Sequence, residues 1–156
     1  MKQRTKGLIA GSVALTALAT SSISYYEGRS LRAYQDIVNV WTICDGESKG
    51  VKPRDVATPA QCDAMLVKNL VTYEAGLDRC LIAPVPGVVK VQFLSWAYNV
   101  GVGAACGSTL VRKANAGDIR GACNELLKWD RAGGRKVRGL TVRREAENRA
   151  CLGALS

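Results

Sequence analysis

Six cysteines in a chain of 156 residues that has no histidine constrain this sequence more than any other feature. No two of them form a C-x-x-C pair; they are Cys44, Cys62, Cys80, Cys106, Cys123 and Cys151. Zinc ligands rarely show such spacings without histidine, so we expect no metal site. Disulfides in an oxidising compartment are the better interpretation, although six cysteines allow about fifteen pairings. Buried thiols in a reduced cytosolic protein are the alternative.

The length and the charge of the chain limit its organisation and its partners. One domain with one hydrophobic core, plus a short N-terminal appendage, is the simplest division of a chain of this size. Lys and Arg number 22 against 13 acids, a net charge of +9, which favours polyanions such as nucleic acid, anionic lipid or a wall polymer. Much of the excess lies in residues 131–149, where a solvated helix face is the simpler interpretation.

The N-terminus has the pattern of a weak membrane segment. Residues 1–6 carry three basic side chains, and residues 7–26 are uncharged and long enough to cross a bilayer as a helix. The basic residues should stay on the cytoplasmic side. Small and hydroxyl side chains dilute the apolar ones, so we expect a segment that can insert and later leave. A signal peptide cleaved near Ala17-Leu18-Ala19 and a permanent anchor are the alternatives.

After this segment, short strands give way to helices. The alternation of Val38, Val40 and Thr42 with their neighbours, and the turn signal at Asp45-Gly46, predict two or three short strands in 34–51. Apolar spacing, with Thr58 as N-cap, then predicts helices over 59–83 and 88–100, the second closed by Gly101 and Gly103. We expect shorter helices from about 108 and 118 to 129, a loop at 132–134 and a final helix over 141–151. There is no internal repeat.

Glu27, Asp36 and Thr42 form a candidate catalytic set. Cleavage of a glycosidic bond commonly takes two acidic groups, one that protonates the leaving oxygen and one that activates water or stabilises the transition state. The acid must stay protonated near working pH, which burial or a neighbouring charge can arrange. The hydroxyl of Thr42, on a predicted strand, would help to hold the attacking water. The spacing alone is weak evidence, because Glu27 also fits a membrane-boundary charge and Asp36 a turn residue.

The order of the motifs along the chain resembles the phage-type, T4-like lysozyme family. Glu27, Asp36 and Thr42 match its E-x8-D-x5-T signature, and the likeness is greatest to the signal-anchor-release endolysins of lambdoid phages. It continues through residues 93–103, 108–110, 117–118, 129–134 and 139–145, and so covers almost the whole chain. The resemblance implies an α+β, lysozyme-like fold with a small antiparallel sheet and a mostly helical lobe. The domain would be residues 27–156, after a basic N-terminus (1–6) and a signal-anchor-release segment (7–26).

The resemblance also implies a reaction and a role for each residue. Glu27 would be the general acid, and Asp36 and Thr42 would position the attacking water. The reaction would be hydrolysis of the β-1,4 bond between N-acetylmuramic acid and N-acetylglucosamine, without a cofactor. Two further roles follow by matching: Asn99 would line the sugar cleft, and one of the pair Arg143 and Arg144 would pair with Glu27.

Partners and location follow from the same resemblance. Peptidoglycan would be the substrate, and a monomer would be held at the inner membrane by residues 7–26 and then released into the periplasm, with no role for nucleic acid. A lytic transglycosylase is one alternative. The other is a non-catalytic, membrane-anchored module that binds polyanions, although the sequence lacks the interleaved aromatic and basic residues of single-strand binders.

The sequence departs from the family pattern in two places. Many relatives have histidine within five residues after Thr42, where this chain reads Ile43-Cys44-Asp45-Gly46-Glu47. Residues 7–26 contain no cysteine, so we expect tethering, and not a thiol switch in that segment, to hold activity off. Our preferred disulfides are Cys44–Cys62 and Cys123–Cys151, which leaves Cys80 to pair with Cys106.

Overall fold

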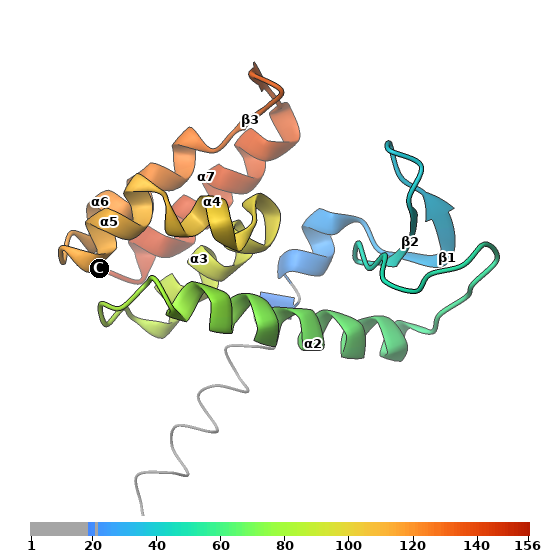
Figure 1. Ribbon diagram of the computed structural model, residues 1–156. Coiled ribbons are helices and arrows are strands. Elements are labelled where there is room, and N and C mark those ends of the chain that lie inside the picture. The colour runs from blue at the N-terminus through green and yellow to red at the C-terminus, as the bar shows by residue number, and fades with distance from the viewer. Residues whose placement is uncertain (1–18, 21) are drawn as a thin grey trace, which may run out of the picture. The chain divides into compact units, whose positions relative to one another are not determined.

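The computed structural model describes residues 19, 20 and 22–156, and Figure 1 shows their helices and strands. Most of the expected membrane segment, residues 7–26, lies outside this part of the chain. Its described portion is helical, and this helix continues to residue 27. Among the described residues, none of the helices combines the length and the apolar character that crossing a bilayer requires.

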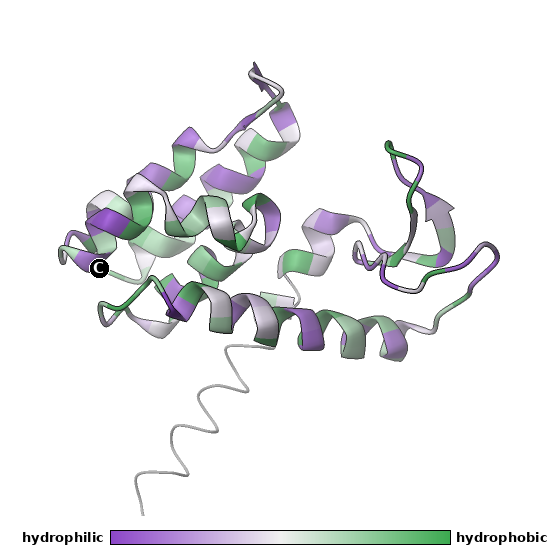
Figure 2. Ribbon diagram, viewed as in Figure 1, coloured by the Kyte–Doolittle hydropathy of each residue, from purple (hydrophilic) through white to green (hydrophobic). Residues whose placement is uncertain are grey.

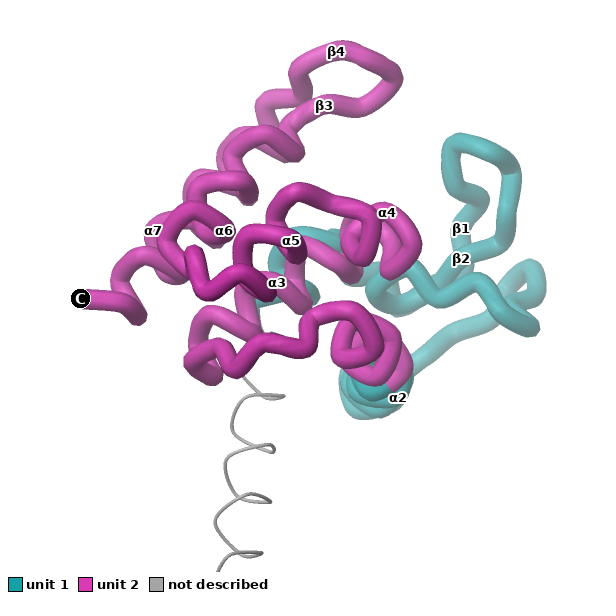
Figure 3. The backbone as a smooth tube through the Cα atoms, turned by 60° about the vertical axis from the view of Figure 1, so that its left-hand side comes forward, with its two compact units in different colours: residues 1–71 teal, residues 72–156 magenta. Residues whose placement is uncertain are grey.

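The chain divides into two compact units, residues 1–71 and residues 72–156, which Figure 3 colours separately. The first unit contains β1 (Ser30–Gln35), β2 (Trp41–Cys44) and the beginning of α2 (Pro59–Asp78). The second contains the end of α2 and the remaining elements, which are α3 (Gly87–Val100), α4 (Val102–Cys106), α5 (Thr109–Asn115), α6 (Ile119–Glu125), the 3-10 helix η1 (Leu126–Lys128), β3 (Arg131–Ala132), β4 (Arg135–Lys136) and α7 (Arg138–Gly153).

β1 and β2 form the small antiparallel sheet that was expected, and Thr42 lies on a strand as predicted, but only β2 lies wholly within the predicted range 34–51. Tyr34 pairs with Thr42 and Gln35 with Trp41, so the predicted strand pattern that began at Val38 is wrong. Val38 belongs to the turn, because the carboxylate of Asp36 accepts hydrogen bonds from backbone amides there and closes the loop. The described residues of the first unit have no third strand. They have isolated β-bridges instead, including one between Arg32 and Val56.

A small core and a disulfide stabilise the first unit. Ile43, Cys44, Ala57 and Cys62 are all less than 8% exposed, and a disulfide joins the two cysteines. This bond ties the end of β2 to the first turns of α2, which begins as the sequence predicts. The Thr58 hydroxyl accepts from the Gln61 amide, while the Gln61 side chain accepts from the Thr58 amide, so the two residues form a capping box.

The helix α3 lies at the centre of the second unit. Its Phe93 and Trp96 are fully buried in a cluster with Leu77, Leu110 and Leu126. The remaining expected disulfides, Cys80–Cys106 and Cys123–Cys151, both lie in this unit, so all three preferred pairs are confirmed. The two cysteines of Cys80–Cys106 are 26 residues apart and those of Cys123–Cys151 are 28 apart, and each of these two bonds should stabilise the fold by roughly 3 kcal/mol, chiefly through the unfolded chain.

Four details of the second unit differ from the sequence prediction. α2 ends at Asp78 and not at residue 83. A short helix, α4, follows Gly101, where we expected the chain only to leave α3. The predicted loop at 132–134 is the turn of a small hairpin, because Gly133 (φ 56°) and Gly134 (φ 76°) both adopt the left-handed conformation that two-residue hairpin turns require. α7 begins at Arg138, three residues before the expected start.

One buried acid, Glu125, links α5, α6 and η1 through two lysines that reach the surface. Glu125 is 4% exposed, and its Oε1 accepts from Lys113 Nζ at 2.7 Å and from Lys128 Nζ at 2.9 Å. The hydrogen bond from Lys113, followed by that from Lys128, lowers the pKa of Glu125 below its usual value. The carboxylate therefore stays charged in the folded protein at pH values where it would be protonated in the unfolded chain.

This shift predicts an acid-sensitive contribution to stability. Because the pKa of Glu125 is lower in the folded state, the ionised side chain stabilises the folded protein. This contribution to the free energy of unfolding is complete above the unfolded pKa, near 4.5, and is lost as the pH falls through the folded pKa. In thermal unfolding between pH 7 and pH 3, Glu125→Gln should lower the Tm at pH 7, with a stability loss of about 1–3 kcal/mol, and should flatten the decline in acid. Glu145→Gln, at an exposed position of α7, is the matched control. Parallel Tm curves for wild type and Glu125→Gln would contradict the assignment.

Candidate catalytic site

Glu27 is the last residue of the helix over residues 22–27. Gly28 follows with a φ of 70°, the left-handed conformation that commonly ends a helix and that glycine adopts without strain. The chain then turns through Arg29 into β1. Glu27 therefore lies at a sharp change of direction between the N-terminal segment and the hairpin, and its side chain is partly buried.

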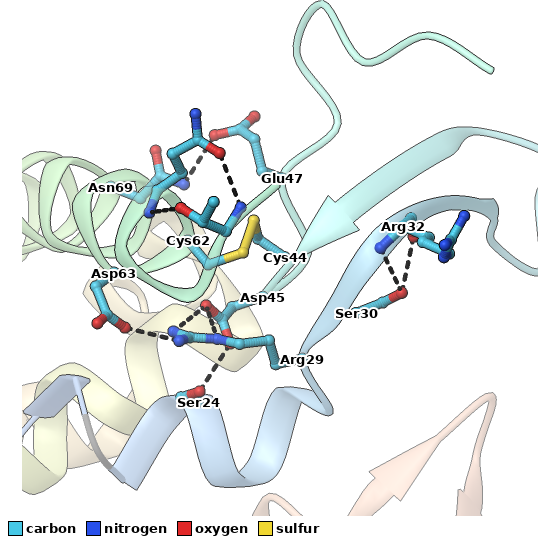
Figure 4. The surroundings of a disulfide bond; sticks show 12 residues. Ser24, Arg29, Ser30, Arg32, Cys44, Asp45, Glu47, Cys62, Asp63 and Asn69 are labelled. Carbon is cyan, nitrogen blue, oxygen red and sulfur yellow. Dashed lines mark hydrogen bonds and ion pairs between the residues drawn. A yellow bond between two sulfur atoms is a disulfide. The ribbon is translucent and has the colours of Figure 1, made fainter. Parts of the chain in front are cut away.

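One buried carboxylate, that of Asp45, binds both Ser24 and Arg29, as Figure 4 shows, and these two residues lie before and after Glu27 in the sequence. Asp45 Oδ1 accepts from Ser24 Oγ at 2.9 Å, and Asp45 Oδ2 accepts from Arg29 Nη2 at 2.7 Å. The Nη1 of Arg29 donates to Asp63 Oδ1 at 2.7 Å. The hydrogen bonds to Asp45 raise the pKa of Arg29 above its usual value, so the guanidinium is charged at every accessible pH.

Asp36 and Thr42 are both hydrogen-bonded to the backbone of the same residue. Asp36 Oδ1 accepts from the amides of Val38 and Val40, each at 2.9 Å, and Thr42 Oγ1 donates to the carbonyl of Val40 at 3.1 Å. Among the described residues, Asp36 Oδ2 has no hydrogen-bond partner. The Thr42 hydroxyl uses its proton on Val40 and keeps its lone pairs as acceptors. The hairpin thus orients two oxygen acceptors of the kind that hold a water molecule.

The other predicted residues, Asn99, Arg143 and Arg144, lie in the second unit, where a buried carboxylate binds the two arginines. Glu147 is 1% exposed and accepts from Arg144 Nη1 at 2.6 Å, Arg143 Nε at 3.2 Å and Ser95 Oγ at 2.7 Å. Arg144 also donates to Asn99 Oδ1. Burial raises the pKa of Glu147 above its usual value, and the charges of the two arginines oppose that rise. The pairing of either arginine with Glu27 stays a prediction.

The loop that follows Thr42 contains two acids, which bind different parts of the chain. Asp45 binds Arg29, whereas Glu47 accepts from Asn69 Nδ2, on α2, at 3.0 Å. Burial raises the pKa of Glu47, but the bonds from Asn69 and from backbone amides, including that of Lys49, outweigh it and leave the pKa below its usual value. An ionised carboxylate that binds α2 therefore supports the loop.

A surface pocket of about 370 Å³ lies on the hairpin, but it is not part of the candidate set. Its lining includes Trp41, which precedes Thr42 in β2, together with Arg32 of β1 and Arg54. Glu27, Asp36 and Thr42 are all absent from this lining.

Sequence reasoning missed Arg29, Asp45 and Glu147. Asp45-Gly46 was interpreted only as a turn signal, and the carboxylate of a turn aspartate is usually exposed. Arg29 directly follows the Glu27-Gly28 pair, but a single arginine there carries no pattern. Glu147 lies four residues after Arg143, a spacing that places the two on one face of a helix and could have indicated their pairing.

Comparison with known proteins places this arrangement in a family. Residues 24–147 match the family model described as phage lysozyme. The SAR-endolysins of Enterobacteria phages PA-2 and P21 are each 42% identical over 127 residues, which are 81% of this chain and 77% of each relative. The endolysin from Escherichia coli O157:H7 phage FAHEc1 has the same fold, with a TM-score of 0.78 and 27% identity over 86% of this chain and 90% of that one.

The family model spans both units and includes every candidate residue from Glu27 to Arg144. The helices and small antiparallel sheets described above are those of the lysozyme-like fold, as the sequence predicted. The chain belongs to the phage lysozyme family.

Proposed function

We propose that this protein is an endolysin that hydrolyses the β-1,4 bond between N-acetylmuramic acid and N-acetylglucosamine in peptidoglycan, and so lyses the host cell. Glu27 is the general acid, and Asp36 and Thr42 position the attacking water. The observation that carries the proposal is the hydrogen bonding of Asp36 and Thr42 to the backbone of Val40, which orients a carboxylate oxygen and a hydroxyl at one point of the hairpin.

These two groups have the chemistry that hydrolysis by water needs. A carboxylate can accept a proton from the attacking water, and a hydroxyl that already donates to a carbonyl can accept a hydrogen bond from the other hydrogen of that water. The backbone amides on Asp36 Oδ1 hold that carboxylate in a fixed rotamer. A lytic transglycosylase needs the acid but no positioned water, so this pair favours hydrolysis over the transglycosylase alternative.

The catalytic roles predict the behaviour of two isosteric variants. Glu27→Gln keeps the shape of the side chain and removes its proton-donating ability, and it should lower the rate at least about a hundredfold, since general acid–base catalysis contributes roughly that much or more. Asp36→Asn should also lower the rate strongly, because an amide is a poor acceptor for the proton of water. Turbidity loss of outer-membrane-permeabilised cells measures both rates. Asp118→Asn, which retains the oxygen acceptor of a helix N-cap in the second unit, is the control.

The products of digestion separate the two enzymatic alternatives. Hydrolysis adds one water molecule and leaves a reducing end, whereas transglycosylation leaves an anhydro sugar, and mass spectrometry distinguishes them. Anhydro products would reject the hydrolase assignment. Unchanged lysis by Glu27→Gln would reject the catalytic assignment altogether and would favour the non-catalytic, polyanion-binding alternative.

We further propose that residues 7–26 hold the enzyme at the inner membrane, facing the periplasm, until this segment is released. Small and hydroxyl residues such as Gly11 and Ser12 weaken its hold on the bilayer. The SAR-endolysin names of relatives that are 42% identical support this course. Because the segment contains no cysteine, its attachment to the membrane would itself keep Glu27 from acting.

A more apolar segment should therefore delay lysis. Gly11→Leu with Ser12→Leu should shift the enzyme from the soluble periplasmic fraction to the membrane fraction and postpone lysis, as fractionation and culture turbidity would show. Val13→Leu, which exchanges one apolar residue for another, is the matched control and should release normally. Intact-mass measurement of the soluble protein distinguishes release from cleavage. A soluble chain that begins near Ser21 would show that the segment is a cleaved signal peptide and would contradict the release proposal.

A further inference from the structure

The part of the chain that carries Glu27 is attached to one carboxylate at two points. Ser24 lies three residues before Glu27, so the two side chains are on the same face of the helix. Arg29 lies two residues after Glu27. Both donate hydrogen bonds to Asp45, at 2.9 Å and 2.7 Å. Glu27 thus lies between two contacts with the same group, and that group controls both the position of the helix end and its direction.

Asp45 reaches this position through a strained loop. Cys44 has a φ of 58°, which is unfavourable by roughly 1–2 kcal/mol for a residue with a side chain, and Gly46 has a φ of 97°. Reciprocal hydrogen bonds between Ile43 and Glu47 close the loop. Asp45 is only 3% exposed, and a carboxylate buried to this degree is costly unless it is paired. An ordinary turn aspartate would require neither the burial nor the partner.

A disulfide holds the partners of Arg29 in place. Asp45 follows Cys44 in sequence, and Asp63 follows Cys62, so the Cys44–Cys62 bond brings the two acids to either side of one guanidinium. Figure 4 shows the side chain of Arg29 extending between them. The helix before Glu27, the end of β2 and the start of α2 are therefore joined at a single point.

We propose that Asp45 is a positioning residue, which sets the place of Glu27 relative to the hairpin that carries Thr42. The inference rests on the proposed function, in which Glu27 is the general acid. Thr42 precedes Asp45 by only three residues, so a contact that fixes Glu27 to Asp45 also fixes it to the water-holding group. A general acid must lie within hydrogen-bond reach of the leaving oxygen, and a misplacement of about 1 Å can lower the rate on the order of a hundredfold.

Asp45→Asn tests the proposal in the full chain, purified after release. The variant preserves the volume of the side chain and removes its charge, so Arg29 loses one of its two acidic partners. We expect kcat on a peptidoglycan suspension to fall at least tenfold while KM stays within about twofold, because a side chain that is 3% exposed does not touch the sugar. Asp78→Asn is the matched control, since it takes one of two acidic partners from Lys90 and should leave kcat unchanged.

A second pair of variants keeps the proposal testable if Asp45→Asn fails to fold. Ser24→Ala removes only one hydroxyl and should lower kcat about three- to tenfold, in line with the typical net contribution of one hydrogen bond, whereas Ser24→Thr should restore activity. All rates are compared at a temperature where circular dichroism shows the variants fully folded. A kcat within twofold of wild type for folded Asp45→Asn, or for Ser24→Ala if that variant alone folds, would overturn the proposal and leave Asp45 a merely structural residue.

Glu27→Gln, measured beside these variants, separates the two ways of failing. If Glu27→Gln is inactive and Asp45→Asn retains its kcat, only the positioning role is lost. If Glu27→Gln retains its kcat, the assignment of the general acid is wrong and the positioning role falls with it.

Discussion

The ion pair between Arg29 and Asp45 is the interaction on which the first unit depends. A buried charge requires a partner, and here the guanidinium binds the carboxylate through Nη2 at 2.7 Å and through Nε at 3.1 Å. This pair connects the end of β2 to the chain just after Glu27. The nearby Cys44–Cys62 disulfide keeps the partners together in the oxidising compartment that the cysteine content indicates.

The second unit uses the same principle around Glu147. Arg143 and Arg144 are 4% and 0% exposed, and both bind this carboxylate, so three charged side chains of α7 are buried together against Ser95 of α3. Figure 2 shows hydrophilic residues along α7, and part of this polar character faces the interior. Each unit is thus organised by a buried acid and its arginine partners, next to an apolar core.

Much of the fold could be predicted from local sequence. The apolar spacing of α2 and α3, the Thr58 N-cap and the strand position of Thr42 depend on neighbouring residues, and the structure confirms them. Strand boundaries could not be predicted in this way. Val38 and Val40 alternate with their neighbours as strand residues do, but the carboxylate of Asp36 competes for their amides and forms a turn instead.

The sequence by itself indicated the family, the proposed roles of Glu27, Asp36 and Thr42, and the presence of disulfides, because these inferences depend on residue type, order and spacing. Only the tertiary structure decided what surrounds those residues. Asp45 and Arg29 are 16 residues apart, and Glu147 and Ser95 are 52 apart. Such pairs leave no periodic pattern in a sequence. A buried charge is stable only when it is hydrogen-bonded or paired, and the tertiary fold decides which groups lie close enough to pair with it.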